Sequence, residues 1–173
     1  MRLGKTPIIT AMQIERRVAE LAGQISRDYA GRELLLIVVL KGSVIFASDL
    51  MRRLTVPVTL DFVRARSYRN TESTGRVECT FHPEQSVAGK HVLILEDILD
   101  SGRTASAIVE HIRQGRPDSL ALCALFDKPS RRVVPMTADY VGFTPDDRFV
   151  VGYGLDYNEC GRELPDLYVL EGE

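Results

Sequence analysis

The chain has 173 residues, of which 45% are hydrophobic and 27% are charged, and its formal net charge at pH 7 is −2. This composition excludes a disordered or fibrous protein, and the small negative charge offers no basic field for non-specific binding to nucleic acid. The longest fully apolar stretch, LLLIVVL at 34–40, is too short to cross a bilayer and the N-terminus lacks the apolar run of a signal peptide, so we expect a soluble, cytoplasmic protein with no membrane partner.

Amphipathic helices and apolar strands are expected to alternate along the chain. Residues 10–30 have apolar positions at helical spacing, Thr10 and Gln13 are spaced as in a capping box, and Gly31 follows the helix. The continuous apolar run at 34–40 predicts a strand that is buried on both faces. Further helices are expected at 43–54 and 105–115, further strands at 58–68, 91–97 and 119–126, a fifth sheet element at 148–156, and a polar loop at 69–76.

The alternation of strands and helices predicts an α/β fold in which a central, mostly parallel sheet is flanked by helices. In such sheets ligands bind at the carboxyl ends of the strands, so residues at strand ends are the candidates for chemistry. The sequence contains neither a GxxxxGK[ST] loop nor a GxGxxG loop, and the common triphosphate and dinucleotide sites are therefore not indicated.

The segment from His91 to Ile112 carries the clearest chemical pattern. Its apolar strand ends in Glu96 and Asp97, and two adjacent carboxylates there are costly unless a ribose diol or a hydrated Mg²⁺ compensates them. The loop Asp100-Ser101-Gly102-Arg103-Thr104 then offers backbone N–H groups, two hydroxyls and a helix N-terminus to a phosphate. Taken alone, an Asp-Ser-Gly turn is equally an ordinary helix cap, and it is the acidic pair before it that makes the combination specific.

LEDILDSGRT, at residues 95–104, resembles the phosphoribosyl pyrophosphate motif of the type I phosphoribosyltransferases, and in particular that of the 6-oxopurine branch. The resemblance implies one domain over residues 1–173, with a small hood formed by the N- and C-terminal segments. It implies that Glu96 and Asp97 bind ribose and Mg²⁺ and that residues 100–104 bind the 5-phosphate. The acid at Asp100 marks the branch, because it can exchange a proton with N7 of a purine as N9 attacks or leaves the ribose carbon.

Three further segments resemble the parts of this family that bind pyrophosphate and close the site. Lys41-Gly42 resembles the pyrophosphate loop, in which the family holds the Lys-Gly peptide in the cis form and directs a backbone N–H at pyrophosphate. Ser67-Tyr68 begins a stretch that resembles the flexible catalytic loop. Arg162 lies in a C-terminal stretch that resembles the family's signature there, and the resemblance implies that it contacts pyrophosphate.

Residues that would bind the purine are implied in the same way. Lys128 resembles the lysine that donates to the 6-oxo group, and a pure donor favours a carbonyl oxygen over an exocyclic amine. Tyr140 resembles the aromatic residue that stacks on the base, with Val141 supplying backbone contacts, and Asp156 resembles a second metal ligand beside the base. From the residues alone, a surface lysine is the less favoured alternative for Lys128, whereas Tyr140 could equally be a core aromatic residue.

The resemblance implies an Mg²⁺-dependent enzyme of purine salvage. It would join hypoxanthine or guanine to the ribose 5-phosphate of phosphoribosyl pyrophosphate, giving IMP or GMP and pyrophosphate, and it would form a homodimer or homotetramer. One alternative is a regulatory protein of the same fold that binds RNA or nucleotides, and the weak charge and the acid at Asp100 argue against it. A second alternative, a structural domain of flavodoxin type, leaves the Glu96-Asp97 pair unexplained.

Overall fold

The computed structural model describes residues 2–67, 77–81 and 83–171. Its helices are α1 (Ala11–Asp28), α2 (Val44–Met51) and α3 (Arg103–Gln114), with a short 3-10 helix, η1, at Pro129–Arg131. Its strands are β1 (Leu34–Val39), β2 (Val58–Ser67), β3 (Val77–Phe81), β4 (His91–Leu99), β5 (Ser119–Asp127), β6 (Tyr140–Phe143), β7 (Val150–Val151) and β8 (Tyr168–Val169). No helix within the described ranges is long and apolar enough to span a membrane.

Six strands form one sheet in the order β3-β2-β1-β4-β5-β6, and the five from β2 to β6 in this order run parallel. Only β3 is antiparallel to its neighbour, β2. All six residues of β1 are buried, as a strand with helices over both faces requires, and this explains its uninterrupted apolar sequence. The predicted fold class, a mostly parallel sheet flanked by helices, is confirmed.

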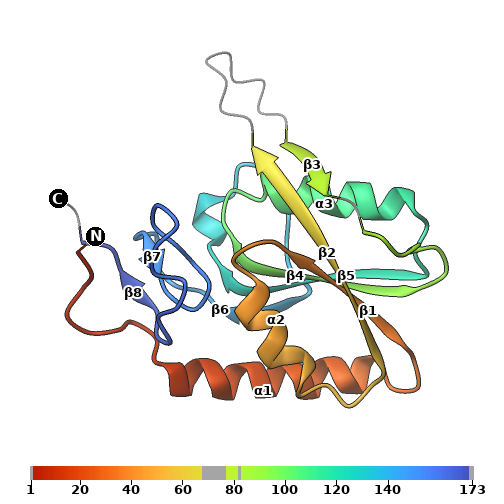
Figure 1. The fold of residues 1–173 in the computed structure, drawn as a ribbon, viewed down its shortest axis with the longest axis horizontal. Helices are drawn as coiled ribbons and strands as arrows, with labels where there is room; N and C mark the ends of the chain where they lie inside the picture. Colours follow the sequence, from red (N-terminus) through yellow and green to blue (C-terminus); the bar gives the residue numbers. More distant parts are fainter. Residues whose placement is uncertain (1, 68–76, 82, 172–173) are drawn as a thin grey trace.

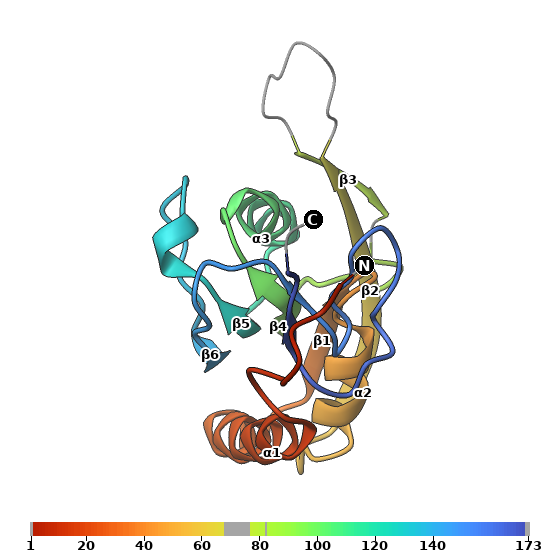
Figure 2. The same cartoon turned by 90° about the vertical axis from the view of Figure 1, so that its left-hand side faces the viewer.

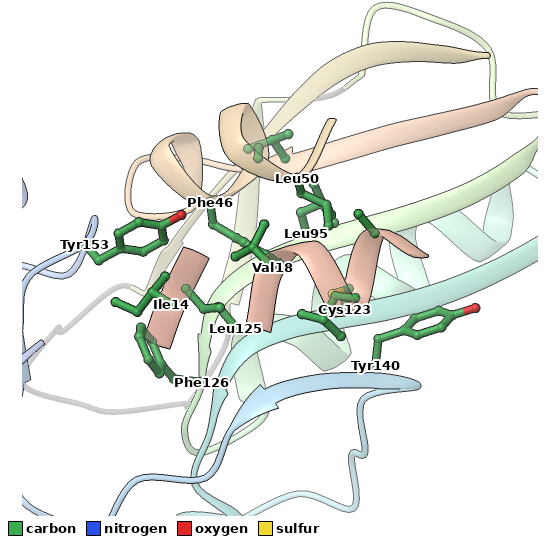
Figure 3. Packing of buried hydrophobic residues seen from close by; sticks show 14 of the residues in the cluster. Ile14, Val18, Phe46, Leu50, Leu95, Cys123, Leu125, Phe126, Tyr140 and Tyr153 are labelled. Carbon is green, nitrogen blue, oxygen red and sulfur yellow. The ribbon is translucent and has the colours of Figure 1, made fainter. Parts of the chain in front are cut away.

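Helices α1 and α2 cover one face of the sheet and α3 covers the other (Figure 2). On the first face, Ile14 and Val18 of α1 pack with Phe46 and Leu50 of α2 against the strands (Figure 3). The capping box expected at the start of α1 is present: the Thr10 backbone N–H donates to the Gln13 side chain at 2.8 Å, and the Gln13 N–H donates to the Thr10 hydroxyl at 3.3 Å.

The two ends of the chain lie together and form the predicted hood beside the sheet (Figure 1). The N-terminal segment pairs with the C-terminal one at Leu3 and Leu170 and again at Ile9 and Leu167. Strands β7 and β8 form a separate antiparallel pair in this part of the molecule. The hood therefore consists of short backbone pairings between segments that are far apart in sequence.

Three predicted boundaries were wrong. Strand β4 continues past the acidic pair to Leu99, because Ile98 and Leu99 still pair with β5. The expected fifth strand at 148–156 contains only the two residues of β7, and the last parallel strand is β6 instead. Helix α1 ends at Asp28, three residues before Gly31.

Candidate active site

A cleft of about 440 Å³ opens where β4 and β5 end and the hood begins. The end of β4 and the loop after it supply three of its residues, the segment directly after β5 supplies two, and the chain from Asp147 onward supplies the rest. The cleft is lined by Asp97, Ile98, Asp100, Lys128, Arg131, Asp147, Phe149, Val150, Leu155 and Asp156. Four of the residues predicted to be functional thus line one cleft, and Asp97, Asp100 and Lys128 are brought there by the carboxyl ends of two parallel strands.

The acidic pair lies at the base of this site. Glu96 is only 7% exposed, and its Oε2 atom has no hydrogen-bond partner among the described residues. Burial, and after it the charge of Asp97, raises the pKa of Glu96 well above its ordinary value. A Cβ atom on Gly42 would lie 1.5 Å from Asp97 Oδ2, so the pyrophosphate loop touches this carboxylate and a side chain at position 42 is excluded.

The phosphate loop has the geometry of an open helix N-terminus. Helix α3 begins at Arg103, and its N-cap residue, Gly102, has a left-handed φ of 81° with no side-chain cap. The Arg103 N–H already reaches the Ser101 hydroxyl oxygen at 3.4 Å, and the helix dipole favours an anion that accepts from the other N–H groups of this first turn. The backbone of Ser101 is fixed by the segment after η1, because its carbonyl oxygen accepts a hydrogen bond from Val133 N at 3.0 Å.

Asp100 faces the cleft as a carboxylate that is already paired with a cation. Its Oδ1 atom accepts a hydrogen bond from Arg131 Nε at 2.6 Å, and both side chains are about half exposed. Arg131 belongs to η1, which follows β5, so the pair joins the two strand ends that frame the cleft. Sequence reasoning missed Arg131, although its place three residues after Lys128 in a strand-end segment was a usable signal.

Lys128 is not a surface lysine. Its residue is 4% exposed, and burial lowers the pKa of its ammonium group below the ordinary value. The Nζ atom donates to the carbonyl oxygen of Arg148 at 2.6 Å, which fixes the side chain and leaves two N–H donors for other partners. Its place in the lining of the cleft makes those donors available to a ligand.

The prediction that Tyr140 stacks on a base does not fit the structure. Tyr140 is the first residue of β6, is 8% exposed, and lies in the core beside Cys123 (Figure 3). Its hydroxyl donates to Asp28 Oδ2 at 2.9 Å, at the end of α1. The carbonyl oxygen of Val141 is also occupied, because Arg17 Nη2 of α1 donates to it at 2.8 Å. Both residues hold α1 against the sheet.

The aromatic residue of the cleft is Phe149. It is 53% exposed, lines the cleft together with Val150, and its ring lies edge-to-face with that of Tyr157 at 5.9 Å between centroids. Treating 148–156 as one strand hid this residue, since a phenylalanine in a strand is expected to be core. An exposed ring directly before the buried pair Val150–Val151 was the available signal.

Lys41, Asp156 and Arg162 lie in one network of ion pairs that also includes Glu159. Arg162 Nη2 is 2.7 Å from Asp156 Oδ1, and Lys41 Nζ is 2.8 Å from Glu159 Oε2. The hydrogen bond from Lys41 lowers the pKa of Glu159.

The cis peptide bond lies one residue before the predicted position, between Leu40 and Lys41. Ser67 ends β2, and Tyr68 lies outside the described residues.

Comparison with known proteins identifies the family. The model of the phosphoribosyl transferase domain matches residues 6–158. The hypoxanthine-guanine phosphoribosyltransferase of Staphylococcus aureus strain Mu50 is 41% identical over 170 residues, which covers 98% of this chain and 95% of the relative. The hypoxanthine phosphoribosyltransferase of Salmonella typhimurium is 45% identical over 161 residues, with 91% and 90% covered. The chain belongs to the hypoxanthine-guanine phosphoribosyltransferase family.

A solved structure extends this result to three dimensions. The hypoxanthine-guanine phosphoribosyltransferase of Bacillus anthracis matches this phosphoribosyltransferase with a TM-score of 0.92 at 45% identity, covering 96% of this chain and 99% of that one. The hypoxanthine phosphoribosyltransferase of Trypanosoma cruzi also reaches 0.92, at 38% identity, with 99% and 93% covered. The arrangement of sheet, helices and hood is therefore shared with the family.

Proposed function

We propose that this chain transfers ribose 5-phosphate from phosphoribosyl pyrophosphate to N9 of hypoxanthine or guanine, releasing pyrophosphate and giving IMP or GMP. The observation that carries the proposal is that Asp100 and Lys128 line one cleft while the open N-terminus of α3 follows Asp100 directly. A carboxylate that can exchange a proton with the purine, a hydrogen-bond donor for the purine's 6-oxo group and a site for phosphate are thus adjacent. The alternative of a regulatory nucleotide-binding protein needs no carboxylate at position 100.

The purine would occupy the part of the cleft formed by Lys128, Phe149 and Val150. The two free N–H groups on Lys128 Nζ would donate to the 6-oxo oxygen, and the Phe149 ring would cover one face of the base. As the bond from N9 to the ribose carbon forms and the bond from that carbon to pyrophosphate breaks, Asp100 would take the proton from N7. Arg131 holds the Asp100 side chain in place for this step.

The sugar phosphate would lie between the acidic pair and the start of α3. The 5-phosphate would accept hydrogen bonds from backbone N–H groups of residues 101–104 and from the hydroxyls of Ser101 and Thr104. The ribose hydroxyls would donate to Glu96 and Asp97. The partnerless Oε2 atom of Glu96 supports this assignment, because a ribose hydroxyl would satisfy it.

The cleft also fits a hydrated magnesium ion that is held mainly by substrate oxygens. Asp97 and Asp156 line it, and Glu96 lies beside Asp97. Among the described residues no three His, Cys, Asp or Glu side chains form a metal site by themselves. Mg²⁺ commonly takes one or two carboxylates and completes its shell with phosphate and water oxygens, so Asp97, Asp156 and Glu96 suffice for it here. When bound, the ion would neutralise charge on the pyrophosphate group.

Pyrophosphate would leave toward the side of the cleft where Lys41, Gly42 and Arg162 lie. Both cations would stabilise the negative charge that grows on the leaving group as its bond to ribose breaks. Gly42 already touches Asp97, so this loop and the acidic pair would contact opposite ends of the same substrate. Ser67 and Tyr68 are proposed to belong to a loop that excludes water during the transfer.

One assay tests the proposed function. The protein is incubated with hypoxanthine, phosphoribosyl pyrophosphate and Mg²⁺, and the formation of IMP is followed, with adenine as the control base. We expect IMP from hypoxanthine and no appreciable AMP from adenine. Absence of IMP would refute the proposal.

Assembly as a homodimer or homotetramer is a separate proposal, supported by the relative from T. cruzi, whose structure was studied for the role of its C-terminal region in oligomeric state.

A further inference from the structure

A turn of the hood presents a carboxylate to the two side-chain cations that we assign to pyrophosphate. Glu159 Oε2 lies 2.8 Å from Lys41 Nζ and 3.6 Å from Arg162 Nη2. The contact with Lys41 joins residues that are 118 positions apart in the sequence, so it closes the hood onto the loop after β1. One carboxylate therefore bridges both cations.

The guanidinium of Arg162 is occupied by protein acceptors in this state. Its Nη1 atom donates to the carbonyl oxygen of Gly154 at 2.8 Å, and its Nη2 atom is shared between Asp156 at 2.7 Å and Glu159. Its Nε atom is buried and has no hydrogen-bond partner among the described residues. A second anion can thus gain full contact with Lys41 and Arg162 only if Glu159 moves away.

The backbone at Glu159 is an unfavourable place for such a residue. Tyr157 and Cys160 exchange backbone hydrogen bonds of 2.9 and 3.1 Å, and the two residues between them, Asn158 and Glu159, have φ values of 52° and 64°. Two positive φ angles define a type I′ turn, which favours asparagine first and glycine second. A glutamate in the second position is a backbone outlier, and outliers of this kind are retained where the side chain has a use.

We propose that Glu159 is an internal competitor of pyrophosphate: its carboxylate occupies Lys41 and Arg162 in the free protein, and pyrophosphate must displace it. This inference rests on the proposed function, which assigns those two cations to pyrophosphate. The side chains of Lys41 and Glu159 are 49% and 65% exposed, so the ion pair is weak and easily exchanged. Competition of this strength lowers the affinity for the product and speeds its release without blocking the substrate.

The inference is tested by calorimetric titration of the free protein with magnesium pyrophosphate. Glu159→Gln removes the charge and keeps the size and the strained turn, so we expect its Kd for pyrophosphate to fall about two- to fivefold, the scale of an exposed ion pair. Glu163→Gln is the matched control. It causes the same change in net charge in the same segment, at an exposed residue that is paired with neither cation in the described structure. We expect it to bind like the unmodified protein.

An unchanged or higher Kd in Glu159→Gln would overturn the inference, because a carboxylate that only positioned the two cations would weaken binding when lost. Lys41→Met provides the second measurement. In that background the gain from Glu159→Gln should shrink, since half of the competition has been removed, and an undiminished gain would also overturn it. The binding measurement needs no turnover. If the unmodified protein forms IMP and Glu159→Gln gains no affinity, the inference about Glu159 alone fails, whereas absence of IMP refutes the function.

Discussion

The Asp100 carboxylate is paired with Arg131 and still faces the cleft, where it is available to a ligand. The Arg131 Nε atom binds Oδ1 of Asp100 at 2.6 Å, and the Asp100 side chain, which lines the cleft, remains about half exposed. A carboxylate held in this way can accept a proton through its other oxygen without moving. The role proposed for Asp100 therefore depends on its ionisable oxygen rather than on its contribution to the fold.

Replacing that oxygen should affect the rate far more than binding. We expect Asp100→Asn to lower kcat about 10²- to 10⁴-fold, as is usual for loss of a general acid or base. The affinity for phosphoribosyl pyrophosphate should change little, since the loop after residue 100 is intact. Steady-state kinetics measure both quantities. Asp118→Asn, at an exposed aspartate between α3 and β5, is the control, and full activity in Asp100→Asn would remove this residue from the mechanism.

Two aromatic residues offer a direct contrast between binding and packing. Phe149→Ala should raise the KM for hypoxanthine by roughly 5- to 100-fold, because stacking of a base on an aromatic ring contributes about 1–3 kcal/mol. Tyr140→Phe should leave that KM unchanged and lower the free energy of unfolding by about 1 kcal/mol, since it removes only the hydrogen bond to Asp28. Kinetics with hypoxanthine and urea denaturation measure the two effects. The reverse pattern would restore Tyr140 as the stacking residue.

At the scale of elements, the unit β4–loop–α3 was the most predictable part of the chain. Its apolar run, acidic pair and Gly102 lie together in sequence, so local pattern was sufficient. The purine side was less predictable, because the residues that line it come from β4, η1 and the hood and meet only through tertiary packing. The strands β6, β7 and β8 have four, two and two residues, too few for periodicity to show.

The turn at Gly102, which leads into α3, allows the proposed phosphate site to be tested. Gly102 has φ of 81°, and a Cβ atom there would lie 3.0 Å from Val134 Cγ2 and 3.2 Å from Met136 Cβ. We expect Gly102→Ala to lower the free energy of unfolding by about 1–3 kcal/mol and to raise the KM for phosphoribosyl pyrophosphate, because the loop must shift to accept the methyl group.

Gly89→Ala is the control that separates backbone strain from an effect on the phosphate site. Gly89 also has a positive φ, 69°, but no atom of the described residues lies within 4 Å of its Cβ position, and it lies at the opposite end of β4. We expect it to lose stability through backbone strain and to keep the KM unchanged. Equal effects of the two substitutions on the KM would show that the geometry at Gly102 is not specific to phosphate binding.

At the scale of the whole molecule, a part-buried hydrogen bond from α1 supplements the backbone pairing that attaches the hood to the α/β body. Asp166 Oδ1 accepts a hydrogen bond from Ala11 N at 2.6 Å, so a residue near the C-terminus caps the first turn of α1. Its other oxygen accepts from the Tyr168 hydroxyl at 3.2 Å. A carboxylate at a helix N-terminus is also favoured by the helix dipole. Asp156 and Arg162 belong to the same hood, so a hood that moved relative to α1 would carry them with it.

Removing the Asp166 carboxylate should therefore loosen the hood while the sheet stays folded. For Asp166→Ala we expect a loss of about 1–2 kcal/mol, equivalent to a Tm lower by roughly 2–8 °C, because a capping bond to a charged acceptor is lost. Amide hydrogen exchange should rise over residues 150–170 and stay unchanged in β1 and β4. Glu171→Gln, which breaks only the exposed pair with Arg2, is the control and should leave both measurements unaltered. Because the loosened hood carries Arg162, affinity for pyrophosphate should fall in Asp166→Ala, and an unchanged affinity would show that the hood holds its position without α1.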